Sequence, residues 1–139
     1  CKMKKSKINL ILFGIILIFL IGCANTQFEG KETIELTKSS YKNMTTDELN
    51  KQLKNKDFVL IDVHIPEQEH IKGTDAFIPY DKIENQLSKL PSEKDAKIVL
   101  YCRTGRMSEI AAEKLAEKGY TNVHNVVGGK VEWDKKGYK

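Results

Sequence analysis

Cys102 is the residue of this sequence best placed to act as a nucleophile. It follows an apolar run at 98–101 and opens a loop that leads into a helical pattern at 109–118. A thiol between a strand end and a helix start lies among unpaired backbone N–H groups, near the positive end of a helix dipole. Arg103 and Arg106 add positive charge to the same loop. These features favour the thiolate, which is the nucleophilic form of cysteine.

An inert cysteine buried at the end of a strand is the alternative interpretation of Cys102, because free cysteines are usually buried. The Arg-Thr-Gly-Arg sequence at 103–106 favours the chemical role instead. His64, His70 and His124 lack metal-ligand spacing, and no ligands cluster near Cys102 in the sequence. We therefore expect neither a metal site nor a cofactor.

The first 22 residues have the features of a secretory signal peptide. Lys4, Lys5 and Lys7 precede an uncharged, apolar stretch at 8–21. At about 1.5 Å per residue this stretch spans roughly 21 Å as a helix, which is short of the ~30 Å core of a bilayer. A signal-peptide core fits this length better than a stable membrane anchor does.

The end of that stretch, Leu-Ile-Gly-Cys at 20–23, resembles the lipobox of bacterial lipoproteins. The resemblance implies that residues 1–22 are removed and that Cys23 is lipidated, which would anchor the protein to the bacterial cell membrane on its extracytoplasmic side. An uncleaved anchor with a chance cysteine is the alternative. If Cys23 carries lipid, Cys102 is the only free thiol of the processed chain, and no intrachain disulfide forms.

The basic excess of the chain belongs to the signal segment. Residues 1–22 contain four of the 23 basic residues and none of the 19 acidic ones, so residues 23–139 carry equal numbers of both. Such a balance gives no electrostatic reason to bind nucleic acid. We expect no nucleic-acid partner and a monomeric protein.

The rest of the chain is divided into a tether and one domain. Residues 23–40 are rich in Thr, Ser, Lys and Glu and lack a clear period, which predicts a flexible tether. Residues 41–139 are long enough for a single domain with a modest core. Thr45 and Glu48 have capping-box spacing at the start of a helix.

Alternating strand and helix patterns predict an α/β domain with a parallel sheet. The apolar runs at 58–63 and 97–101 are typical of strands buried on both faces. Asp81 is expected to cap a helix that carries Ile83, Leu87 and Leu90. In parallel sheets the functional crevice lies beyond the carboxyl ends of the strands, where Asp62 and Cys102 both fall.

Four segments, in this order, resemble the sequence signature of single-domain rhodaneses, over about residues 45–138. They are Asp-Val-His with Pro-Glu at 62–67, His-Ile-Lys-Gly followed by Phe-Ile-Pro at 70–79, Tyr-Cys-Arg-Thr-Gly-Arg-Met-Ser at 101–108, and Gly-Gly with Trp and Gly at 128–137. The resemblance implies a rhodanese-like fold, which is a central parallel sheet of about five strands flanked by helices on both faces.

The chemistry that the resemblance implies is sulfur transfer. The thiolate of Cys102 would take a sulfane sulfur from a small donor such as thiosulfate, and a thiophilic acceptor would then remove it from the persulfide. Backbone N–H groups of the loop would stabilise the anionic sulfur. The implied substrate-binding residues are Arg103, Thr104, Gly105, Arg106, Met107, Ser108, Asp62 and His64.

Three positions depart from the family pattern. Met107 and His64 stand where the family commonly has Arg, and Lys72 replaces a Pro. A phosphatase-type site needs an Arg six positions after its Cys, but Ser108 stands there, which disfavours phosphatase chemistry. Two alternatives to an active sulfurtransferase remain open, namely a persulfide relay for a protein partner and a non-catalytic binding module of the same fold.

Overall fold

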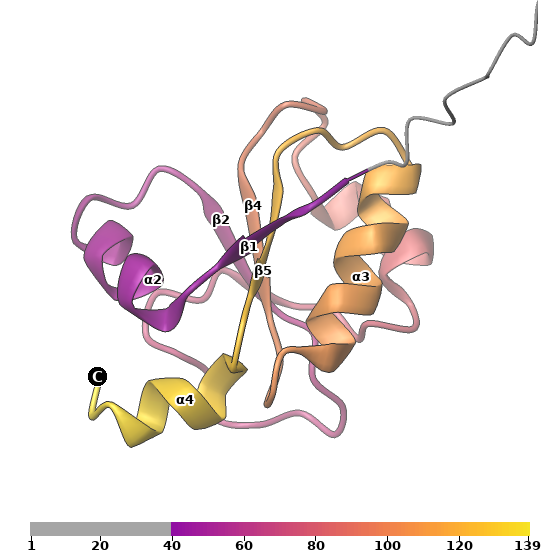
Figure 1. Ribbon diagram of the computed structural model, residues 1–139. Coiled ribbons are helices and arrows are strands. Elements are labelled where there is room, and N and C mark those ends of the chain that lie inside the picture. Colours follow the sequence, from indigo (N-terminus) through magenta and orange to yellow (C-terminus); the bar gives the residue numbers. More distant parts are fainter. Residues whose placement is uncertain (1–39) are drawn as a thin grey trace, which may run out of the picture. The chain divides into compact units, whose positions relative to one another are not determined.

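The computed structural model describes residues 40–139, which contain a five-stranded sheet and its helices (Figure 1). The predicted signal segment, Cys23 and all but the last residue of the predicted tether lie outside the described residues. The strands are β1 (Lys42–Met44), β2 (Val59–Asp62), β3 (Ala76–Phe77), β4 (Ile98–Tyr101) and β5 (Val123–Val126). The helices are α2 (Thr46–Gln52), α3 (Arg106–Glu117) and α4 (Gly129–Lys135), with 3₁₀ helices η1 (Leu53–Asn55) and η2 (Ile83–Lys89).

All strand pairs are parallel, and the order across the sheet is β1-β5-β4-β2-β3. β4 lies at the centre, and all four of its residues are buried. Asp62 of β2 pairs with Tyr101 of β4, and Asn125 of β5 pairs with Leu100 of β4. The carboxyl ends of β2, β4 and β5 therefore meet at one edge of the sheet, which is where the predicted site residues should lie.

Helices cover both faces of the sheet, as the sequence predicts. Leu49 of α2 and Trp133 of α4 pack with Leu60 and Val99 on one face. On the other face, η2 and α3 pack against the strand residues that alternate with these, among them Ile61, Ile98 and Leu100. Successive strand side chains point to opposite faces, so each central strand contributes to both cores. Figure 1 shows α2 and α4 on one side of the strands and α3 on the other.

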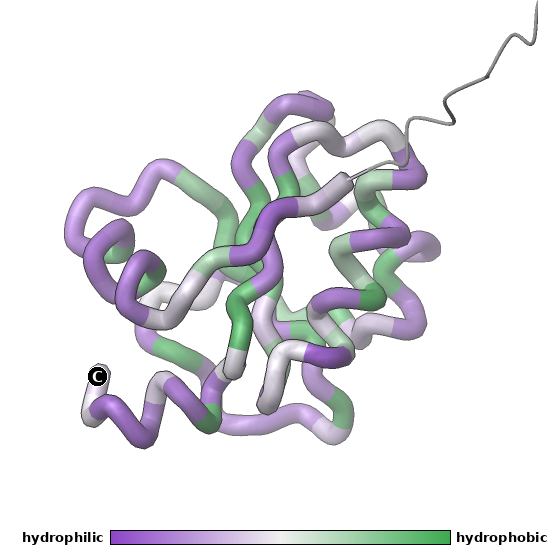
Figure 2. Tube along the Cα trace, viewed as in Figure 1, coloured by the Kyte–Doolittle hydropathy of each residue, from purple (hydrophilic) through white to green (hydrophobic). Residues whose placement is uncertain are grey.

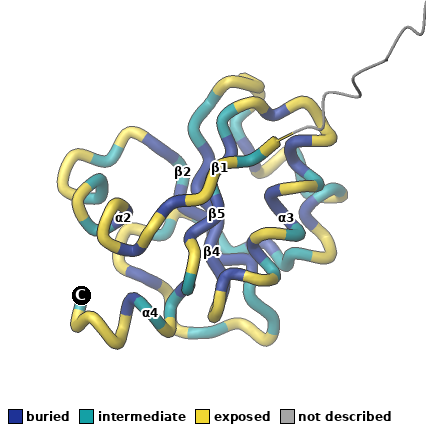
Figure 3. Tube along the Cα trace, viewed as in Figure 1, coloured by how far each residue is buried: buried dark blue, intermediate teal, exposed yellow. Residues whose placement is uncertain are grey.

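Burial follows the same arrangement. The buried segments in Figure 3 lie along the strands and on the inner sides of the helices, while the outer turns are exposed. Figure 2 shows the hydrophobic residues concentrated in the same central region. None of the helices within residues 40–139 is both long and apolar enough to cross a membrane.

The predicted capping box at the start of α2 is present. The backbone N–H of Glu48 donates to Thr45 Oγ1 at 3.2 Å, and the backbone N–H of Thr45 donates to Glu48 Oε2 at 2.7 Å. These reciprocal bonds satisfy N–H groups that the helix itself leaves unpaired.

The structure corrects the prediction of a helix capped by Asp81. Residues 83–89 form a 3₁₀ helix whose N-cap is Lys82 without a side-chain bond, and Gln86 interrupts it with φ −122° and ψ 28°. The backbone N–H of Asn85 donates to Lys82 O, an i→i+3 bond. The apolar spacing identified the buried face correctly, because Ile83 and Leu90 reach the core, but such a face forms in a broken 3₁₀ segment as well.

Candidate active site at the carboxyl end of β4

Cys102 directly follows β4 and lies beneath a short loop. Only 1% of the residue is exposed, and the backbone N–H of Gly105 donates to its Sγ at 3.1 Å. Gly105 adopts φ +100°, a conformation that other residues rarely take, and this turn directs its N–H back toward the sulfur. The loop therefore supplies a backbone donor to the atom on which negative charge would reside.

The helix after the loop begins three residues earlier than the sequence pattern indicates. Gly105 is the N-cap of α3, and Arg106 is its first residue, whereas the pattern indicates a start at Glu109. The backbone N–H of Glu109 donates to Gly105 O at 3.0 Å and closes the first turn. The apolar spacing of Met107, Ala111 and Leu115 places Met107 on the buried face of this helix, but apolar spacing does not mark the residue at which the first turn begins. The earlier start places the helix N-terminus directly against the cysteine.

Ser108, in this first turn, links the sulfur to the neighbouring strand. Its Oγ lies 3.5 Å from Cys102 Sγ and 2.6 Å from Oδ1 of Asn125 on β5. Asn125 in turn donates through Nδ2 to Asn43 Oδ1 on β1 at 3.3 Å. The single hydroxyl hydrogen of Ser108 can bond to only one acceptor at a time. It is therefore able to turn from Asn125 toward a charged sulfur.

The amino end of α4 supports the loop through two backbone hydrogen bonds. The backbone N–H of Lys130 donates to Cys102 O, and that of Val131 donates to Arg103 O, both at 2.9 Å. Gly129 allows this approach, because an added Cβ would lie 2.8 Å from the carbonyl carbon of Arg103 and closer still to Cys102 O. These bonds hold the backbone of Cys102 and Arg103 against the helix.

Asp62 organises the second segment near the site, residues 64–70. Its carboxylate is fully buried and accepts bonds from the backbone N–H of His64 at 2.9 Å, from Gln68 Nε2 at 3.1 Å and from His70 Nδ1 at 2.9 Å. The bond with Asp62, aided by Glu67, raises the pKa of His70 above its ordinary value, although burial opposes the shift. Asp62 thus binds groups of the protein itself.

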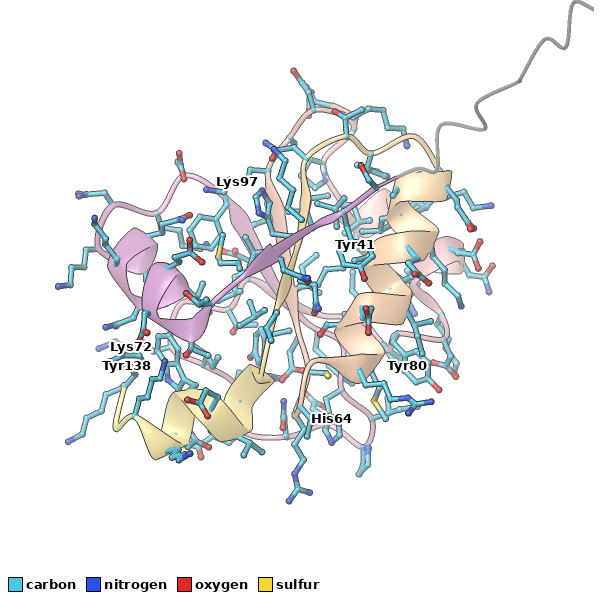
Figure 4. The ribbon with its side chains drawn as sticks, in the orientation of Figure 1. Tyr41, His64, Lys72, Tyr80, Lys97 and Tyr138 are labelled. Carbon is cyan, nitrogen blue, oxygen red and sulfur yellow. The ribbon has the colours of Figure 1, made fainter. Side chains whose placement is uncertain are left out.

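Two clefts border the cysteine loop, and the structure separates the two arginines between them. Arg103 lines a cleft of about 340 Å³ together with His64, Gln68 and Lys130. Arg106 and Thr104 line another, of about 310 Å³, together with Asn125. In Figure 4, His64 lies at the end of the molecule where α3 and α4 begin. Either cleft offers positive charge to an anion, and the predicted substrate-binding roles of these residues stay predictions.

Met107 lines neither of these two clefts. Its half-buried side chain packs against the core cluster that contains Cys102 and Ala111. The position where the family commonly has Arg is thus an apolar contact here.

Three further residues belong to this end of the sheet and were not predicted as site residues. Asn125 lies within a predicted strand, and a polar residue at a buried strand position is the sequence signal that points to it. Gln68 and Lys130 reach the site through tertiary contacts, which no pattern in the sequence predicts.

Comparison with known proteins shows the family to which the chain belongs. The family model of the rhodanese-like domain matches residues 45–136, and the chain belongs to this family. The thiosulfate sulfurtransferase PspE of Escherichia coli is 38% identical over 71 residues, which are 49% of this chain and 67% of that protein. A sulfurtransferase of Allochromatium vinosum is 34% identical over 84 residues, covering 58% of this chain and 76% of that protein.

Solved structures give the same result for the fold. A rhodanese-like domain protein of Staphylococcus aureus is 30% identical, with a TM-score of 0.58 over 66% of this chain and 90% of that one. A rhodanese-like domain of Anabaena matches the fold with a TM-score of 0.62 over 69% of this chain and 75% of that one. The predicted rhodanese-like fold is confirmed, and the sulfurtransferase relatives support sulfur transfer as the general chemistry.

Proposed function

We propose that this protein is a sulfurtransferase that carries a sulfane sulfur on Cys102, from a donor such as thiosulfate to a thiophilic acceptor. The observation that carries the proposal is the placement of Cys102 Sγ, 3.1 Å from the N–H of Gly105 at the start of α3. Backbone donors that are fixed before the reaction stabilise developing negative charge without reorganisation.

The reaction has two balanced steps. The Cys102 thiolate attacks the outer sulfur of thiosulfate, an S–S bond forms, the S–S bond of thiosulfate breaks, and sulfite leaves with its electron pair. The acceptor, for example cyanide, then attacks the outer sulfur of the persulfide and leaves as thiocyanate, which restores the thiolate. No external oxidant or reductant is needed, and the enzyme returns to its starting state.

The other site residues have distinct tasks in this proposal. Gly105 and Ser108 support the anionic sulfur, and Arg103 or Arg106 attracts the anionic donor from its own cleft. Asp62 acts indirectly, because its carboxylate fixes the segment that contains His64 and Gln68.

Intact mass spectrometry tests the chemistry. The full chain in detergent is exposed to thiosulfate, and we expect an adduct of about 32 Da, one sulfur atom, that cyanide removes. The variant C102S serves as the control and should gain no mass. An unmodified wild-type protein, or an adduct that persists in C102S, would refute the proposal.

We further propose that the protein is a lipoprotein, lipidated at Cys23 and anchored to the extracytoplasmic side of a bacterial cell membrane. The support is the short apolar stretch that ends in Leu-Ile-Gly-Cys. Growth with a labelled fatty acid should label the wild-type chain and leave C23A unlabelled. Retention of residues 1–22 without any label would show that the stretch is an uncleaved anchor instead.

A further inference from the structure

Two exposed valines flank the candidate active site. Among the described residues, 40–139, Val127 and Val131 are the only large hydrophobic residues that are exposed, at 49% and 47%. They stand on either side of the Gly128–Gly129 turn, which packs directly against the Cys102 loop. Both of the exposed apolar side chains thus lie at the active-site end of the sheet.

The backbone holds both valines in place. The N–H of Val127 donates to Met44 O, and the N–H of Val131 donates to Arg103 O, both at 2.9 Å. Val127 borders the cleft that contains Arg106, and Val131 borders the cleft that contains Arg103. Each cleft therefore presents one of these valines beside one exposed arginine.

Neither arginine is neutralised by an ion pair within the described part of the chain. The acids that line the two clefts with them each have another hydrogen-bond partner. Glu109 accepts from the hydroxyl of Tyr41 at 2.6 Å, and Asp134 accepts from Lys130 Nζ at 2.8 Å. Glu67 is bound to His70 at 3.0 Å. The guanidinium groups remain available to a partner.

We propose that Val127, Val131, Arg103 and Arg106 form a docking rim for a protein that takes the sulfur on its own cysteine thiol, set in an acidic surface with apolar residues beside it. The inference rests on the proposed sulfur transfer and names its acceptor. A small inorganic acceptor gains nothing from two exposed valines, whereas a protein surface buries them on contact. Carboxylates on the partner complement the two arginines and guide its approach.

The transfer step to such a partner is balanced. The partner's thiolate attacks the outer sulfur of the Cys102 persulfide, a new S–S bond forms on the partner, and the bond to Cys102 Sγ breaks. Cys102 leaves as the thiolate, whose sulfur accepts a hydrogen bond from the backbone N–H of Gly105. The partner gains one persulfide, and the net charge is unchanged.

The probes are synthetic peptides, each with a single cysteine. One has leucines beside the cysteine and glutamates outside them, the second replaces the glutamates by lysines, and the third replaces the leucines by serines. The Cys102 persulfide of the full chain in detergent is mixed with each peptide, and the rate of sulfur transfer to the peptide is measured. Cyanide is the small acceptor run in parallel.

We expect the peptide with leucines and glutamates to react fastest and to lose its advantage as salt screens the arginines. V127S and V131S should each lower its rate about fivefold, through lost apolar burial, and should leave the rate with cyanide unchanged. R103Q and R106Q should remove the preference for glutamate over lysine. K51Q removes the same charge from α2, outside both clefts, and should change nothing.

The outcomes separate the inference from the proposed function. Failure of transfer even to cyanide would refute the sulfurtransferase itself. Normal transfer to cyanide, with equal rates for all three peptides or with V127S and V131S equal to wild type, would refute the docking rim alone.

Discussion

His70 Nδ1 lies 2.9 Å from Oδ2 of Asp62, which joins a partly exposed imidazole to a fully buried carboxylate at the end of β2. The other ring nitrogen of His70 lies 3.0 Å from Oε1 of Glu67. A ring whose two nitrogens both face carboxylates is most stable with both nitrogens protonated. The hydrogen bonds of His70 thereby tie residues 64–70, which border the Arg103 cleft, to the sheet.

The first prediction concerns the pH dependence of stability. The bond to Asp62 raises the pKa of His70 in the folded protein. The stabilisation is therefore fully present below the unfolded pKa of about 6.5 and is lost as the pH rises through the higher folded value. We expect the free energy of unfolding of wild type, measured with urea, to exceed that of H70N by more at pH 6 than at pH 8.

Comparing wild type with H70N removes the contribution of His124 from the measured difference in stability. Burial lowers the pKa of His124, so its contribution has the opposite sign and is lost as the pH falls. That contribution is the same in wild type and in H70N. A difference in stability that stays constant from pH 6 to pH 8 would contradict the charged form of His70.

Replacing Cys102 by serine should abolish sulfur transfer. A hydroxyl is close in size to a thiol and can accept from the N–H of Gly105, but it cannot form a persulfide. The thiosulfate–cyanide assay should fall to the background rate, while circular dichroism and thermal unfolding report a folded protein. Thiocyanate production that survives in C102S would eliminate Cys102 as the sulfur carrier.

Apolar pattern predicted the sheet because β2 and β4 are buried on both faces, and such strands are recognisable from sequence alone. The same pattern could not place the start of α3, which depends on the left-handed turn at Gly105. The sequence context and the motifs predict Cys102 and its loop as the site, and this assignment stays a prediction. Motif spacing could not show that Arg103 and Arg106 line different clefts, because that separation arises from the packing of α4 and of residues 64–70 around the loop.

The Ser108 hydroxyl should matter both for stability and for rate. In S108A, Asn125 Oδ1 loses its 2.6 Å partner and Cys102 Sγ loses a nearby donor. An unsatisfied buried acceptor costs about 1–3 kcal/mol in the free energy of unfolding. We expect a loss of this size, with slower transfer from thiosulfate.

The matched control is S92A, because Ser92 makes only an exposed bond to Glu93. It should leave both quantities unchanged, as measured by urea unfolding and by the thiosulfate–cyanide assay. Equal behaviour of the two variants would mean that the hydroxyl network does not support the sulfur.

The last prediction compares two glycines that both have a positive φ and differ in their surroundings. Gly129 and Gly119 have φ of +54° and +88°, so alanine is strained at both positions. An added Cβ meets nothing within 4 Å at Gly119, whereas at Gly129 it lies 2.8 Å from the carbonyl group of Arg103. Only G129A must therefore move the Cys102 loop away from α4.

We expect G119A to cost about 1 kcal/mol in the free energy of unfolding and to keep its transfer rate. G129A should be less stable than G119A and should lose most of its transfer from thiosulfate. A G129A protein that transfers sulfur as fast as G119A would show that the contact between α4 and the loop does not position Cys102.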